Sequence, residues 1–236
     1  LTGTIPPEIG SLTELTTLDL SYNELTGTIP SEIGNLTLLT ILDLSFNELS
    51  GFIPSEIGNL TQLTELWFGN NAFIESIPPE IENLSNLETL SLFNNTLTGS
   101  IPSWIGNLTE LTILDLSLNT LTGFIPQEIG NLTQLTILYL NNNSLTGSIP
   151  PEIGGLTPLL IFYLSDNELT GLIPNSFCNL EDGINLQLTD NNLCPAYPAC
   201  LSEEQIGTQD TSSCPDCEED EIGIDDVCYS QNDLDV

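Results

Sequence analysis

The chain has 236 residues, of which 34 are acidic and none is lysine, arginine or histidine, so its formal net charge is −34. Without such side chains it cannot hold a Ser-His-Asp or Cys-His catalytic centre, a phosphate-binding lysine, a Schiff-base lysine or a histidine metal site. Nucleic acid is not expected as a partner, because basic side chains drive binding to phosphates. No stretch approaches the roughly 18 apolar residues that a membrane span needs.

The chain repeats itself every 24 residues, and each repeat is called a rung here. In one rung Leu114 and Leu116 bracket an outward residue, and this period of two predicts a short strand. The equivalent strands are expected to stack into one parallel sheet of eight strands. An asparagine follows each strand, where its buried amide can satisfy backbone groups of the neighbouring turn. These ladder asparagines are Asn23, Asn47, Asn71, Asn95, Asn119, Asn143, Asn167 and Asn191.

The second half of each rung leads the chain back to the next strand. Glycines such as Gly123 supply a permissive backbone, and the pair Ile125-Pro126 that follows holds the chain extended. Glu75 breaks the glycine column. The stretch after each Ile-Pro pair, for example residues 54–60, has room for about one short helical turn.

The full frame, LxxLxxLxLxxNxLTGxIPxxIGxLT, stands in residues 36–60 and 108–132. It resembles the plant-type class of leucine-rich repeats found in plant receptor ectodomains, polygalacturonase inhibitors and secreted microbial proteins. The resemblance covers residues 1–193 as eight 24-residue repeats. It implies an α/β solenoid, a right-handed superhelix with a concave parallel β-sheet and short helical turns or irregular segments on the convex side. The concave sheet is usually the binding face in this family.

Ligand-binding candidates are therefore sought among the outward residues of the strands. Exposed aromatic rings on a concave surface suit stacking against sugars or anchoring a protein, although lateral packing between rungs explains them equally well. Phe68 and Phe73 replace repeat leucines, so we expect them in the core. The candidates for the concave face are Trp67, Phe93, Tyr139, Tyr163, Asp19, Asp43 and Asp115.

The repeat also aligns charged and hydroxyl side chains in columns. Like charges on successive rungs, about 5 Å apart, repel one another, so a carboxylate ladder either recruits cations weakly, with Ca²⁺ the candidate, or splays apart in solvent. No cofactor and no dedicated metal site is expected. The convex glutamate column is Glu8, Glu32, Glu56, Glu80, Glu128 and Glu152. A threonine column that could organise water or ice, or simply reflect the repeat motif, contains Thr13, Thr37, Thr61, Thr109 and Thr133.

Seven Asn-x-Ser/Thr sequons mark candidate glycosylation sites. Five belong to the repeated Gly-Asn-Leu-Thr frame or its variant, where the repeat itself can require asparagine for its turn. The sequon asparagines are Asn35, Asn59, Asn83, Asn94, Asn107, Asn131 and Asn142.

The two ends of the chain differ from the repeats. Residues 1–20 form a rung with no repeat before it, so an upstream repeat, a partner or end-to-end contact with another copy is expected to cover its apolar side. Residues 194–236 are predicted to be a Cys-rich acidic cap and tail. Its acidic run at 218–221 is read as solvated, because the spacing does not match a calcium loop.

All cysteines follow the regular repeats, which favours disulfides and an extracellular or cell-surface location. Cys217 with Cys228 is the one pairing we predict. A redox or zinc site at Cys214-x-x-Cys217 is the weaker alternative, because a single CxxC lacks a second ligand pair. The six cysteines are Cys178, Cys194, Cys200, Cys214, Cys217 and Cys228.

The sequence thus predicts a non-catalytic extracellular scaffold that binds a protein or glycan on its concave face. Glycoside hydrolysis by a carboxylate pair is the remaining enzymatic option, but no pair is singled out by the sequence. The alternative function is a structural subunit that assembles end to end into an extracellular filament.

Overall fold

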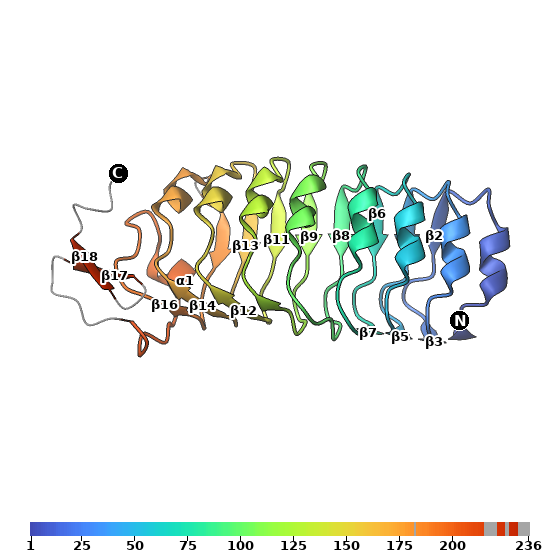
Figure 1. The fold of residues 1–236 in the computed structure, drawn as a ribbon, viewed down its shortest axis with the longest axis horizontal. Helices are drawn as coiled ribbons and strands as arrows, with labels where there is room; N and C mark the ends of the chain where they lie inside the picture. Colours follow the sequence, from blue (N-terminus) through green and yellow to red (C-terminus); the bar gives the residue numbers. More distant parts are fainter. Residues whose placement is uncertain (182, 215–220, 225–226, 231–236) are drawn as a thin grey trace.

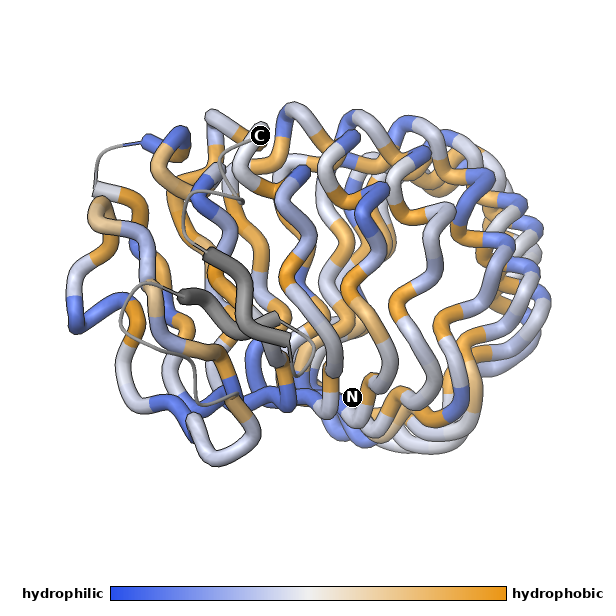
Figure 2. The backbone as a smooth tube through the Cα atoms, turned by 60° about the vertical axis from the view of Figure 1, so that its left-hand side comes forward, coloured by the Kyte–Doolittle hydropathy of each residue, from blue (hydrophilic) through white to orange (hydrophobic). Residues whose placement is uncertain are grey.

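The computed structural model describes residues 1–181, 183–214, 221–224 and 227–230. The rungs stack side by side along the long axis as an elongated solenoid (Figure 1). Apolar residues recur at the same place in successive rungs, as the hydropathy colouring shows (Figure 2). Among the described residues, no helix has the length and apolar character to cross a membrane.

One parallel sheet of eight strands runs the length of the solenoid, which confirms the predicted sheet. Its register is a full repeat, so that Leu18 pairs with Leu42 and Leu90 with Leu114. The predicted inward leucines are buried. The strands are β2 (Thr17–Asp19), β4 (Ile41–Asp43), β6 (Glu65–Trp67), β8 (Thr89–Ser91), β9 (Ile113–Asp115), β11 (Ile137–Tyr139), β13 (Ile161–Tyr163) and β15 (Asn185–Gln187).

Two shorter parallel sheets line a second side of the solenoid, and the sequence did not predict them. They form where the chain passes into the left-handed glycine, for example Gly27 at φ 77°. The sheets are separated near Glu75, which adopts φ 66° in place of a glycine. The strands are β1 (Thr2–Thr4), β3 (Glu24–Gly27), β5 (Glu48–Gly51) and β7 (Ala72–Phe73), then β10 (Thr122–Gly123), β12 (Ser144–Gly147), β14 (Glu168–Gly171) and β16 (Asn192–Leu193).

The predicted helical turns are short 3-10 helices that each follow an Ile-Pro pair. A glycine inside most of them lets the next rung approach, since a Cβ on Gly106 would lie 2.3 Å from the backbone oxygen of Glu128. The turns are η1 (Pro7–Ser11), η2 (Ser31–Asn35), η3 (Ser55–Asn59), η4 (Pro79–Asn83), η5 (Ser103–Asn107), η6 (Gln127–Asn131), η7 (Pro151–Gly155) and η8 (Asn175–Asn179).

The ladder asparagines join each rung to the one before it. The Asn119 Oδ1 accepts the backbone N–H of Leu97 at 3.1 Å, and its Nδ2 donates to the Leu92 oxygen at 3.0 Å. Asn119 itself is buried. Phe68 and Phe73 are fully buried, with ring centroids 5.5 Å apart, so their predicted place in the core is confirmed.

Two disulfides tie the C-terminal segment to the last rungs. Cys178 bonds Cys200, and Cys194 bonds Cys214, which confirms disulfides for four of the six cysteines. Because Cys214 is bonded to Cys194, the alternative CxxC site is wrong. The predicted pairing of Cys217 with Cys228 lies outside the described residues, as do residues 218–220 of the acidic run.

The chain between these cysteines covers the end of the sheet. It contains α1 (Glu203–Ile206), which begins with a capping box at Ser202 and packs near β15. Beyond it, β17 (Glu221–Ile224) and β18 (Val227–Ser230) pair as an antiparallel hairpin. The division of the chain at residue 193 stays a prediction.

Candidate functional site

The outward side of the eight-stranded sheet carries a column of side chains that changes chemistry from rung to rung. The pleat that turns the leucines inward turns the residue between them outward. Parallel pairing places Asp43 beside Trp67 and Tyr139 beside Tyr163. This outward column consists of Asp19, Asp43, Trp67, Ser91, Asp115, Tyr139, Tyr163 and Gln187.

The three aspartates of the outward column share one local geometry. The Asp115 Oδ1 accepts the backbone N–H of Ser117 at 3.1 Å and its hydroxyl at 2.6 Å. Asp19 and Asp43 make the same two hydrogen bonds to the serine two residues later. One oxygen of each carboxylate therefore holds the turn that follows the strand.

Burial separates two of these carboxylates electrostatically. The hydroxyl and N–H of Ser21 stabilise the charged form of Asp19, so the pKa of this exposed carboxyl is lowered. Desolvation raises the pKa of the Asp115 carboxyl, and the hydrogen bonds from Ser117 oppose this only in part. The same Asp-x-Ser turn thus gives opposite shifts at the first rung and in the middle of the sheet.

Tyr139 and Tyr163 form an aromatic pair in the later rungs. Their ring centroids lie 5.1 Å apart, and the Asn185 amide donates to the Tyr163 hydroxyl at 2.6 Å. Burial raises the pKa of Tyr139, helped by the neighbouring Tyr163 and Asp115. Both tyrosines are half-buried, so they pack laterally and still present surface to solvent.

The Trp67 side chain is held next to Glu65 of the same strand, because its Nε1 donates to Glu65 Oε2 at 2.9 Å. Phe93 stands beyond the end of β8 and makes an edge contact with Phe46, with centroids 5.7 Å apart. Phe46 in turn stacks on Tyr22 at 4.2 Å. The sequence reading missed Tyr22 and Phe46, although an aromatic residue in a column otherwise rich in Asn and Asp was a usable signal.

The convex glutamate column follows the 3-10 turns. Glu8 and its equivalents lie in or beside the 3-10 turns, exposed or half-exposed. Within the part of the chain that the structure describes, no three acidic or sulfur side chains converge in a way that could hold a metal ion. Weak calcium association with the glutamate column stays a prediction.

The sequon asparagines lie where a glycan could reach most of them. Five close the 3-10 turns with exposed side chains, at Asn35, Asn59, Asn83, Asn107 and Asn131. Asn94 is also exposed, whereas Asn142 is half-buried. Their glycosylation stays a prediction.

A groove of about 830 Å³ lies away from the eight-stranded sheet, between the strands β12 and β14 and the turns η6 and η7. Phe124 lines it and is 70% exposed, and Pro126, Glu128 and Leu172 contribute further walls. Residues of the repeat frame, such as Ile125, Gly147 and Gly171, supply much of its lining. We therefore give the concave face, with its varied side chains, priority as the candidate site.

Comparison with known proteins gives a consistent picture of the family. The leucine rich repeat profile matches residues 13–73 and 85–145, and related repeat profiles match residues 61–98 and 158–180. None of the curated proteins compared with the chain matches it.

Solved plant receptors share the fold. The plant peptide hormone receptor RGFR1, solved in complex with RGF2, is 43% identical over 82% of this chain, with a TM-score of 0.79. The ectodomain of GASSHO1/SCHENGEN3 from Arabidopsis thaliana, in complex with CASPARIAN STRIP INTEGRITY FACTOR 2, is 41% identical over 86%, with a TM-score of 0.82. The chain spans only 31% and 24% of those two chains.

A solved plant ice-binding protein is also similar. It is 30% identical over 89% of this chain, with a TM-score of 0.69, and the match covers 77% of the ice-binding protein. The same solenoid fold therefore occurs both in peptide hormone receptors and in an ice-binding protein.

Proposed function

The chain belongs to the leucine-rich repeat family, and we propose that it is a non-catalytic extracellular scaffold that binds a protein or peptide on its concave face. The observation that carries the proposal is the outward column, where a fixed backbone presents a different aromatic, acidic or amide side chain on each rung. The similar receptors RGFR1 and GASSHO1/SCHENGEN3 were solved with RGF2 and CASPARIAN STRIP INTEGRITY FACTOR 2, respectively. Two disulfides support an extracellular location.

The side chains of the concave face suit binding better than catalysis. Aromatic rings supply large contact area at low entropic cost, and carboxylates fix the register of a partner by charge. The fold itself does not identify the ligand. A glycan is the other ligand class that the aromatic rings suit, and end-to-end assembly into a filament stays a prediction.

The proposal is tested by selecting peptides from a random displayed library on the parent protein. We expect the selected peptides to bind a Tyr139→Ala/Tyr163→Ala variant at least about tenfold more weakly, the loss of roughly 1.4 kcal/mol that an aromatic anchor supplies. Phe124→Ala is the matched control, because it removes an exposed aromatic ring from a different side of the solenoid. Far-UV circular dichroism verifies that all variants are folded.

Equal binding to the parent and the double variant would contradict the concave face as the site. Binding of neutral oligosaccharides on a glycan array, with no peptide selected, would favour the glycan class instead.

A second candidate function is ice binding, which is favoured by the similar plant ice-binding protein and by the exposed threonine column. Thr61, Thr109 and Thr133 occupy the same position of their rungs, with Ser85 at this position in the rung between Thr61 and Thr109, and all three threonines are exposed. Replacing these three residues by aspartate should abolish inhibition of ice recrystallisation. A parent protein without such inhibition would rule the candidate out.

A further inference from the structure

Three aromatic rings form a continuous strip at the carboxyl ends of the first strands, and we call Tyr22, Phe46 and Phe93 the aromatic ledge. The Tyr22 and Phe46 rings are stacked, with an interplanar angle of 9°, and the Phe93 ring meets Phe46 at 62°. Phe93 reaches Phe46 across a rung that has Gly69 at this place. A Cβ on Gly69 would lie 2.1 Å from the Phe93 ring, so the strip depends on this glycine.

Folding does not account for the aromatic residues of the ledge. Tyr22 and Phe46 occupy a column in which every rung adopts a left-handed backbone, with φ of 52° and 55° at these two positions. Asn and Asp tolerate this conformation, whereas bulky residues are strained in it. The other members of this left-handed column are Asn70, Asn94, Leu118, Asn142, Asp166 and Asp190.

Burial does not compensate for the strain at Tyr22, which is 74% exposed. Backbone strain of this kind clusters at ligand-binding and other functional sites, and Tyr22 combines it with an aromatic ring that stacks on the ring of Phe46. Tyr22 therefore has the features of a contact residue rather than of a core residue.

Four carboxylates lie within three residues of Tyr22 and Phe46 in the sequence. Asp19 and Asp43 come three residues before Tyr22 and Phe46, and Glu24 and Glu48 come two residues after them. Asp19, Glu24 and Glu48 are exposed, and Asp43 is half-buried. The chain has no basic side chain that could neutralise these carboxylates.

The later tyrosine pair has one carboxylate beside it, the half-buried Asp115, which is the strand neighbour of Tyr139. Tyr163 accepts a hydrogen bond from the Asn185 amide, and its strand neighbours on either side are Tyr139 and Gln187. A cation is attracted both to an aromatic face and to nearby carboxylates, and the ledge differs from the later pair in having three exposed carboxylates close in sequence, Asp19, Glu24 and Glu48.

We infer that the aromatic ledge is a subsite for cationic side chains, above all arginine, of a basic segment in a protein ligand. This inference rests on the proposed ligand-binding function of the concave face and adds the charge of the ligand. A planar guanidinium stacks on the aromatic face and donates its N–H groups to Asp19 and Asp43, whereas a lysine ammonium makes only a point contact. The ledge thus prefers arginine to lysine.

The test measures binding of fluorescent hexa-arginine, hexalysine and a neutral hexaglutamine peptide at fixed ionic strength. The variant is Tyr22→Asn/Phe46→Asn, because asparagine already occupies this column in other rungs and leaves the net charge unchanged. We expect hexa-arginine to bind the variant about fivefold more weakly, as loss of a cation–π contact predicts. Hexalysine binding should weaken less.

The matched control is Leu118→Asn, which relieves the same backbone strain outside the ledge and should leave hexa-arginine binding unchanged. Gly69→Ala is a second variant, which keeps all three rings but displaces Phe93, and it should also weaken binding. Thermal unfolding verifies that each variant is folded.

Unchanged hexa-arginine binding to both ledge variants would overturn the inference. An equal loss of hexaglutamine binding would also overturn it, because the ledge would then be a neutral contact surface. Neither outcome affects the separate test in which selected peptides are compared on the parent and the Tyr139→Ala/Tyr163→Ala variant. Failure of the ledge is therefore distinguishable from failure of the concave face as a binding site.

Discussion

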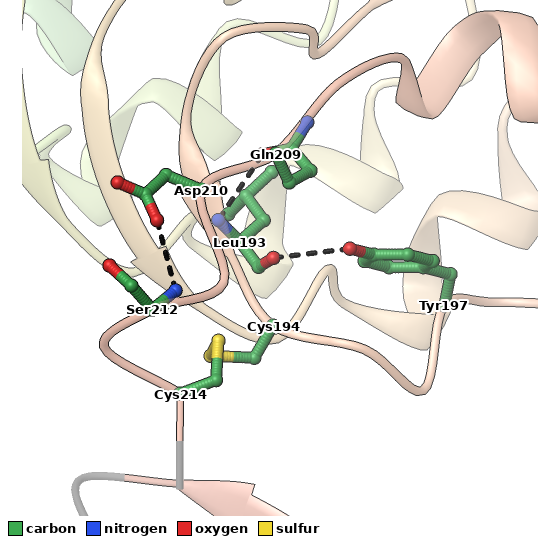
Figure 3. The surroundings of a disulfide bond; sticks show 7 residues. All are labelled: Leu193, Cys194, Tyr197, Gln209, Asp210, Ser212 and Cys214. Atoms are coloured by element: carbon green, nitrogen blue, oxygen red, sulfur yellow. Dashed lines mark hydrogen bonds between the residues drawn. A yellow bond between two sulfur atoms is a disulfide. The ribbon is translucent and has the colours of Figure 1, made fainter.

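The regular rungs and the segment that closes the solenoid satisfy the same backbone groups by different means. Inside the solenoid, Asn191 accepts the N–H of Leu169 and donates to the oxygen of Leu164, and Asn47 and the ladder asparagines after it make the equivalent two bonds. At the closing end, Gln209 makes the equivalent bonds. Its Oε1 accepts the N–H of Leu193 at 3.2 Å (Figure 3). Its Nε2 donates to the Leu188 oxygen at 2.8 Å.

Gln209 is therefore a ninth ladder amide, supplied only 18 residues after Asn191 instead of 24. The longer side chain compensates for a segment that no longer follows the repeat. Cys194 and Cys214 fix this segment covalently next to the bond between Gln209 and Leu193 (Figure 3). Repetition stabilises the interior through identical neighbours, whereas the end needs dedicated residues.

The largest effect is expected when one ladder amide is removed from the interior of the solenoid. Asn119→Ala leaves the Leu97 N–H and the oxygens of Leu92, Leu116 and Ser117 without this partner. At about 1–3 kcal/mol for each buried unsatisfied group, we expect the free energy of unfolding to fall by roughly 4 kcal/mol or more. Urea unfolding followed by circular dichroism measures the loss.

Asn86→Ala is the control for this prediction, because the exposed Asn86 makes a single bond to the Thr61 oxygen at 2.9 Å. We expect its cost to be within about 0.5 kcal/mol of the parent, as for most surface changes. Similar losses in the two variants would mean that the ladder is not a principal source of stability.

The sequence predicted the interior to the level of single residues because a period of 24 fixes every column at once. The buried leucines, the ladder asparagines and the places of Phe68 and Phe73 all follow from that period. The two four-stranded sheets were missed, since strands of two to four residues such as Thr122–Gly123 have no alternating apolar pattern of their own.

The closing segment was less predictable because nothing in it repeats. Gln209 cannot be recognised as a ladder amide from spacing, and cysteine spacing does not distinguish Cys178–Cys200 from other pairings. At the candidate site, the outward column followed from the strand period. The ledge did not, because contact between Phe46 and Phe93 depends on the absent side chain of Gly69 in a rung between them.

Removing a disulfide tests whether the closing segment unfolds independently of the regular rungs. A Cys194→Ser/Cys214→Ser variant should lose about 3 kcal/mol of stability in the closing segment, as for other loops of about 20 residues. Hydrogen exchange should rise first at Leu188 and Leu193, whose amides bond the closing segment, and should remain slow at Leu97. Exchange that rises uniformly along the solenoid would show that the end does not open independently.

The smallest expected effect is the pH dependence of two aspartates with the same local bonds. The pKa of Asp19 is lowered from 3.8, so its contribution to stability is present above that pH and is lost as the pH falls through the folded-state value. The pKa of Asp115 is raised from 3.8, so its contribution is present below that pH and is lost as the pH rises through the folded-state value.

Asp19→Asn and Asp115→Asn should therefore change stability with opposite pH slopes. Each variant keeps an oxygen that accepts the serine N–H and hydroxyl. Each also removes one negative charge from a chain of net charge −34, so the general gain from reduced repulsion is the same in both variants and drops out when the two slopes are compared. Relative to the parent, Asp115→Asn should gain stability as the pH rises above 3.8, and Asp19→Asn should lose stability as the pH rises towards 3.8. Urea unfolding at intervals between about pH 3 and pH 7 measures both slopes. Parallel slopes would show that burial does not distinguish the middle of the sheet from its first rung.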